Sequence, residues 1–303
     1  MKPLKVILDT SALRVLAAQV PRKFQALEKA AQDGRVEFYA SDPVIAETVN
    51  IPGADRLKLH TAILGRLTAR KYLVPWGGAV YHELCGRSQV LRGGEDEVTM
   101  THFLMAVAHG QGKASIARIV QHMEQEKDRL YAYYLSLQRA SQSRFGDDVR
   151  IAGQVPFTFD HVDQGHWVRR GGSLVTKARL LGNDDPVSVR LEVFRANPWT
   201  RPLVKLLGAV LYGSLARRVV RNPHRYPFTR HYSRVFSMLL YRSMALNEPV
   251  GRNDPYDAEV LYWGIECDVL LTHDKGQGER FRALYGSKHV HKVKTLLLHL
   301  GIR

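Results

Sequence analysis

The sequence predicts an α/β protein in which a parallel sheet is flanked by helices and interrupted by a large, mostly helical insertion. Two observations lead to this prediction. Short apolar runs alternate with helix-like segments at the start of the chain and again from about Asn247 to its end, which is the pattern of βαβ units. From Gly93 onward this alternation gives way to polar helical sequence. We therefore expect a discontinuous α/β domain, residues 1–92 and 246–303, with residues 93–245 as a basic insertion.

The first segment predicts three strands that alternate with helices. Short apolar runs indicate buried strands, and they are expected at residues 6–8, 36–40 and 72–75. Apolar residues at helical spacing predict helices at residues 23–32, around 57–70 and at 79–85. One more helix is expected to begin at Ser41-Asp42-Pro43, because proline is favoured at the first helical positions.

The insertion is harder to interpret. Residues 95–142 predict polar helices with an interruption near Gly110. Residues 157–159 and the alternating residues 187–193 are typical of strands, whereas Asp185-Pro186 could open a helix at the second of these places. The structure of residues 146–192 therefore stays open.

Size and composition exclude several classes of protein. A chain of 303 residues with 45% hydrophobic residues can bury a large core. Two cysteines are too few for a disulfide framework, and the thirteen histidines show no usual zinc-ligand spacing. We find no apolar run near the ~20 residues that span a bilayer and no signal-peptide pattern. A cytoplasmic protein without a membrane partner is expected.

The charge is strongly basic, with a net value of +15 and a pI near 9.9. Residues 193–247 contain ten Lys or Arg and no Asp or Glu. Arginine pairs with phosphates and aromatic rings stack on bases, so this stretch is interpreted as an RNA-binding surface. The alternative is a solvated face on a basic protein. The candidate RNA-binding residues are Arg217, Arg218, Arg221, Arg225, Arg230 and Arg234.

Acidic residues mark the other candidate site. Asp9 and Asp274 each end a short apolar run, and parallel sheets bind ligands at the carboxyl ends of their strands. Glu47 and Asp257 lie in helices that could bring them to the same edge. Four carboxylates cannot stay ionised side by side without a cation, and hard oxygen ligands suit Mg²⁺ or Mn²⁺. The sequence therefore predicts a metal site.

Several of these acids also have an ordinary structural explanation, and Asp257 would fit the third helical position of a capping box. Asp9 could be a strand-end turn residue, and Glu47 could be one of the acids favoured in early helical turns. Asp254 before Pro255 fits a helix N-cap. It lies three residues before Asp257, on the same helix face, so it stays open between a cap and a fifth metal ligand.

The same segments carry a family resemblance. Its evidence is the set of runs VILDTS at residues 6–11, SDPVIAE at 41–47, DAEVLYWG at 257–264 and LLTHD at 270–274. In order and spacing these runs resemble the PIN superfamily of metal-dependent nucleases, which includes toxin ribonucleases of toxin–antitoxin pairs. The resemblance covers about half the chain and leaves out the insertion.

The resemblance implies a PIN-like sheet and a divalent-metal-dependent endonuclease that hydrolyses RNA. Catalysis would fall to Asp9, Glu47, Asp257 and Asp274, which would also bind the metal. The resemblance is also compatible with an antitoxin-like protein partner and with a homodimer. The alternative function is a catalytically inactive RNA-binding or scaffold protein on the same fold. A metal-dependent phosphatase of another α/β family is a further rival, but the sequence lacks its DxDx(T/V) start.

Overall fold

The computed structural model describes residues 2–18, 21–69, 71–74, 251–286 and 288–302, with a hairpin and scattered positions between residues 79 and 249. The chain divides into two compact units. The first comprises Met1–Trp76, Gln89–Glu126 and Glu259–Arg303, and the second comprises Gly77–Ser88 and Lys127–Ala258. The domain boundaries expected at residues 92 and 246 stay a prediction.

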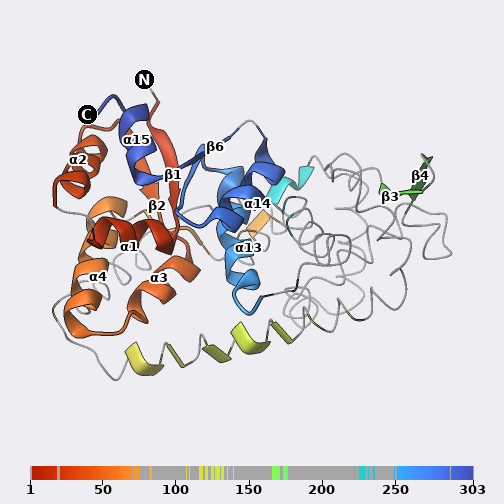
Figure 1. Ribbon diagram of the computed structural model, residues 1–303, viewed down its shortest axis with the longest axis horizontal. Helices are drawn as coiled ribbons and strands as arrows, with labels where there is room; N and C mark the ends of the chain where they lie inside the picture. Colours follow the sequence, from red (N-terminus) through yellow and green to blue (C-terminus); the bar gives the residue numbers. More distant parts are fainter. Residues whose placement is uncertain are drawn as a thin grey trace. The chain divides into compact units, whose positions relative to one another are not determined.

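The first unit is built on a four-stranded sheet in the order β2-β1-β5-β6, with every pair parallel (Figure 1). The strands are β1 Leu4–Leu8, β2 Val36–Tyr39, β5 Val269–Leu271 and β6 His289–His291. In the register, Val6 lies opposite Phe38 of β2 and Ile7 lies opposite Leu270 of β5. Both ends of the chain thus contribute to one sheet, and the predicted α/β class with a parallel sheet is confirmed.

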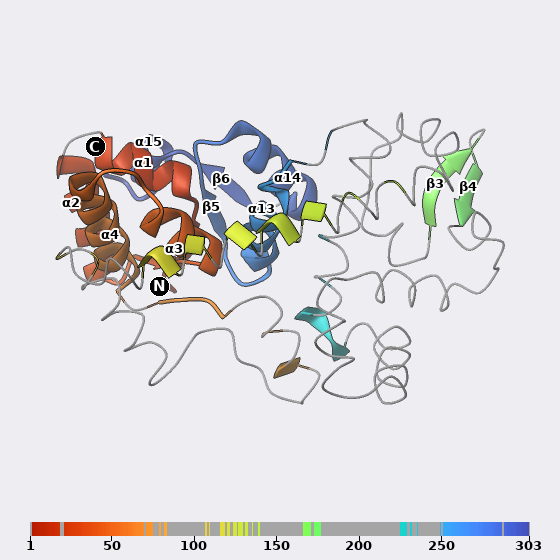
Figure 2. The ribbon, with the colours of Figure 1, turned by 90° about the horizontal axis from the view of Figure 1, so that it is seen from below.

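Helices cover this sheet. They are α1 Thr10–Ala18, α2 Pro21–Gln32, α3 Asp42–Val49, α4 Ala54–Thr68, α14 Lys275–Tyr285 and α15 Val293–His299. The helix α13 Asp254–Tyr262 and the 3-10 turn η2 Trp263–Ile265 precede β5. α1 packs against α2, α3, α4 and α15, while α14 packs against β6. Figures 1 and 2 both show α1 to α4 grouped at one end of this unit and α14 at the other.

The central strand explains why the chain folds this way. Val6, Ile7 and Leu8 are fully buried, as expected for a strand with both faces covered. The strand ends at Asp9, whose backbone carbonyl accepts hydrogen bonds from the N–H groups of Ala12 and Leu13 (3.0 and 3.4 Å). These bonds start α1 directly after β1, and so Asp9 lies at the carboxyl edge of the sheet.

Three details differ from the sequence predictions. α1 was not predicted. The third strand, expected at residues 72–75, is only an isolated parallel bridge between Ala40 and Tyr72. In the open segment, an antiparallel hairpin joins β3 His166–Arg170 to β4 Ser173–Thr176, whereas residues 157–159 and 187–193 lie outside the described residues. Within the described part of the chain, no helix has the length and apolar character needed to cross a membrane.

Candidate active site

The candidate active site begins where β1 and β5 end. Leu8 pairs with Leu271, and the N–H of Asp9 donates to the carbonyl of Leu271 at 3.1 Å. The two strands are parallel, so Asp9 and Thr272 leave the sheet at the same edge. This is the edge at which parallel sheets bind ligands.

The two oxygens of the Asp9 carboxylate are in different situations. Oδ2 accepts hydrogen bonds from the hydroxyl of Thr272, at 2.6 Å, and from the hydroxyl of Ser11. Oδ1 makes no hydrogen bond to any residue that the structure describes. Two neighbouring hydroxyls therefore fix the orientation of the carboxylate and leave one oxygen available to a ligand.

Thr272 connects the two strand ends. It is 2% exposed, and its Oγ1 donates to Asp9 and accepts from the N–H of Asp274 at 3.0 Å. The Ser11 hydroxyl lies 3.1 Å from the Thr272 hydroxyl and accepts from the N–H of His273 at 2.8 Å. The network joins residues that are more than 260 positions apart in the sequence, and it makes the two strand ends one unit.

Asp274 has a structural role that was not predicted. It is the N-cap of α14, with extended backbone angles, and its Oδ1 accepts from the N–H of Gln277 at 2.8 Å. Such a cap stabilises a helix by about 1 kcal/mol. The side chain is otherwise exposed, and its Oδ2 makes no hydrogen bond within the described residues. A ligand role at Oδ2 is compatible with the cap at Oδ1.

Charged groups act on His273 at this edge. Nε2 of the half-buried His273 accepts from the N–H of Val293 at 3.3 Å, which leaves Nδ1 as the protonated nitrogen of the neutral ring. Burial is the main reason why the pKa of His273 is lowered, and the positive charges of Lys292 and Lys23 lower it as well. The negative charge of Asp9 acts in the opposite direction. The ammonium groups of Lys23 and Lys292 and the carboxylate of Asp9 therefore all act on the His273 imidazole.

Glu47 lies in the second turn of α3, the helix that follows β2. It is half-buried and makes no hydrogen bond or ion pair with the described residues. The helix begins after Ser41, which is fully buried and has a hydroxyl without a hydrogen-bond partner in the described part of the chain. The described contacts do not link Glu47 to Asp9.

Asp254 and Asp257 lie in the first turn of α13, in the second compact unit. Asp254 is buried, and its Oδ2 accepts from the N–H of Gly251 at 2.8 Å. Of the five predicted metal ligands, Asp9 and Asp274 are the two that the described hydrogen bonds connect. Among the described residues, no three His, Cys, Asp or Glu side chains are grouped to hold a metal ion.

Most of the predicted RNA-binding residues, Arg217, Arg218, Arg221, Arg230 and Arg234, lie outside the described residues. Arg225 is described and exposed. Two residues interleaved with these arginines are buried instead: Phe228 is 7% exposed and His231 is 6% exposed. The N–H of Phe228 donates to Glu83 Oε1 at 2.8 Å. Burial places these two rings in a packed interior, where they are not available to stack on bases.

Sequence reasoning missed the roles of Ser11 and His273. The signal was present, since a Thr-Ser pair follows Asp9 and a Thr-His pair precedes Asp274. Hydroxyl and imidazole groups directly beside strand-end carboxylates are natural candidates to orient them. However, Ser11 reaches Thr272 and the backbone of His273 at the end of β5, and the imidazole of His273 accepts from Val293 of α15. Only the tertiary structure shows these contacts.

Comparison with protein-family models, with curated proteins and with solved structures finds no match for this chain.

Proposed function

We propose that this protein is a divalent-metal-dependent ribonuclease that hydrolyses RNA phosphodiester bonds at the carboxyl edge of its sheet. The observation that carries the proposal is the Asp9 carboxylate. Two hydroxyls hold its Oδ2, its Oδ1 has no partner in the described residues, and Thr272 ties it to the backbone of Asp274. A carboxylate fixed in this way at a ligand-binding edge is suited to hold a cation.

The donor chemistry fits a hard divalent ion. Asp9 and Asp274 offer carboxylate oxygens, and Mg²⁺ is commonly bound by one or two carboxylates with waters and substrate phosphates as its other ligands. The absence of a group of three ligands among the described residues is compatible with such a site. Glu47 is proposed as an additional ligand, and the metal-binding roles of Asp254 and Asp257 stay sequence-based predictions. A bound metal would lower the pKa of its water and stabilise charge on the transferring phosphoryl group.

The other residues at this edge would bind and orient the substrate. Ser11 and Thr272 keep Asp9 in one orientation, which lowers the reorganisation needed at the moment of reaction. Lys23 and Lys292 supply positive charge for a phosphate. The net charge of +15 favours a polyanionic substrate. Further contacts to RNA are proposed for Arg217, Arg218, Arg221, Arg225, Arg230 and Arg234.

The test is a cleavage assay with an end-labelled single-stranded oligoribonucleotide. We expect cleavage with Mg²⁺ or Mn²⁺, and complete loss on adding EDTA that excess metal reverses, because the metal supplies the activated water. A generic phosphomonoester should not be hydrolysed, and its hydrolysis would favour a phosphatase instead. If the protein binds RNA without metal and does not cleave it, the alternative function, that of an inactive RNA-binding or scaffold protein, is the correct one.

A further inference from the structure

Three histidines gather on one face at the sheet edge formed by β6. His289 and His291 are two residues apart on this strand, so their side chains share a face. Their ring centroids are 5.5 Å apart and the ring planes differ by 4°. His299, in the last turn of α15, lies 5.1 Å from His291 and 5.9 Å from His289. Three imidazoles thus connect the last helix to the edge strand.

The most buried of the three rings, that of His291, is poorly placed to carry a proton. His291 is 8% exposed, and its buried Nε2 has no hydrogen-bond partner within the described residues. A protonated Nε2 would bury an N–H donor without an acceptor among the described residues. Burial lowers the pKa of His291, and His299 and His289 lower it further.

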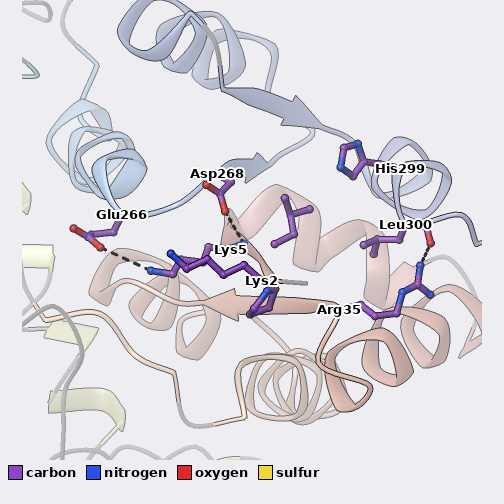
Figure 3. Close-up of a pocket in the computed structure, with 9 residues that line it drawn as sticks. Lys2, Lys5, Arg35, Glu266, Asp268, His299 and Leu300 are labelled. Carbon is purple, nitrogen blue, oxygen red and sulfur yellow. Dashed lines mark hydrogen bonds and ion pairs between the residues drawn. The ribbon is translucent and has the colours of Figure 1, made fainter.

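Charged side chains of both signs line the groove beside His299. Figure 3 shows His299 beside a groove of about 460 Å³, with Leu300 and Arg35 on its own side and Glu266 on the far side. Of the two carboxylates lining this groove, Glu266 lies 3.9 Å from the Lys5 ammonium, and Asp268 accepts from the N–H of Lys5 at 3.0 Å. The cationic residues that line this groove with His299 are Lys2, Lys5 and Arg35. Lys288 and Lys292 flank the two strand histidines in the sequence.

α15 connects this cluster to the candidate active site. Its last turn carries His299, and the Arg35 guanidinium donates to the carbonyl of Leu300 just after it. Its first residue, Val293, donates to His273 at the carboxyl edge. The helix also packs against α1 and α2. A change in how α15 is held at its end can therefore reach the residues around Asp9.

We propose that His289, His291 and His299 form a pH-sensitive latch, which holds α15 on β6 while the buried His291 is neutral and loosens when His291 takes up a proton. The direction of the effect follows from the lowered pKa of His291. The folded protein binds fewer protons than the unfolded chain near the ordinary histidine pKa of about 6.5. The contribution of neutral His291 to folding stability is therefore complete above about pH 6.5 and is lost as the pH falls below it.

The first test is thermal unfolding, followed by circular dichroism at about pH 7.5 and about pH 5.5. The double variant His289→Gln and His299→Gln removes the two exposed rings and keeps the buried one. The wild-type Tm should fall at the lower pH. The double variant should lose part of that fall, because the two neighbouring rings that disfavour a charge on His291 are gone while its burial remains. The matched control is His109→Gln, which removes another exposed histidine and should retain the whole fall. An unchanged fall in the double variant would overturn the proposal.

Hydrogen exchange separates a latch from general acid unfolding. After correction for intrinsic rates, amides of α15 should lose about tenfold more protection than those of β1 when the pH is lowered, because local opening frees one element at a time. In the double variant this difference should shrink. Equal loss of protection in α15 and β1 of the wild type would show global unfolding and would exclude the latch.

Discussion

Replacing Asp9 by Asn is expected to abolish divalent-dependent RNA cleavage while the protein stays folded. Asparagine keeps the volume of the side chain and an oxygen that can accept from Thr272, but it removes the negative charge that would hold a cation. Loss of residues that only support a metal ligand already costs about 10- to 100-fold, so we expect at least about a 100-fold fall in the cleavage rate. Stabilisation of the protein by Mg²⁺ or Mn²⁺ should decrease as well, since a ligand of the folded state raises stability by mass action.

The matched control is Asp268→Asn. Asp268 is an exposed carboxylate at the opposite, amino edge of the same sheet, where it accepts from the N–H of Lys5. This variant should cleave RNA at the wild-type rate. Asp274→Asn should lose cleavage although asparagine can still cap α14. Wild-type cleavage by the Asp9 variant would remove the metal-nuclease assignment, whatever the fold.

Replacing Gly264 by Ala is expected to destabilise the first unit strongly. A Cβ at this position would lie 2.3 Å from Tyr285 Cε2 and 2.7 Å from Phe281 Cε2. The Tyr285 ring cannot move aside easily, because its hydroxyl donates to the carbonyl of Leu261 at 2.6 Å. We expect a destabilisation of about 3 kcal/mol, at the upper end of the usual cost of overpacking, measured by urea unfolding.

Gly65→Ala provides the control for this experiment. Gly65 lies inside α4, and a Cβ there would meet no atom within 4 Å. Alanine is favoured over glycine in a helix interior by about 1 kcal/mol, so this variant should be as stable as the wild type or more stable. If the Gly264→Ala variant has the same urea midpoint of unfolding as the wild type, Tyr285 does not pack closely against Gly264.

The fold could be predicted from sequence where the signal is local. The run at Val6–Leu8 and the run at Val269–Leu271 are apolar and short, and both became central strands of one parallel sheet. α1 was missed although Ala12, Leu13 and Leu16 give it a buried face at helical spacing. Tyr72 is fully buried, as a strand residue would be, yet it forms only a bridge. Burial alone does not determine strand pairing.

The candidate site was predictable only in part. Asp9 and Asp274 follow from the position of an acid at the end of a strand. The hydroxyl network of Ser11 and Thr272 depends on rotamers and on a strand pairing across most of the chain, which no local pattern encodes. The capping role of Asp274 could have been inferred from its place directly before a helix.

The histidine cluster was missed for a related reason. Its strand member is a His-Val-His pattern, which puts two rings on one face whenever the segment is a strand. His299 joins them only because α15 packs back onto β6, and this tertiary contact has no counterpart in residue spacing.

The most direct test of the proposed active site is a crystal structure of the protein soaked in Mn²⁺, with anomalous scattering used to locate the ion. The site at the carboxyl edge predicts an anomalous peak about 2.1 Å from Asp9 Oδ1, with Asp274 or water among its other ligands, and no peak in crystals of the Asp9→Asn variant. A well-ordered carboxyl edge without a peak beside Asp9, or manganese bound only elsewhere, would contradict it.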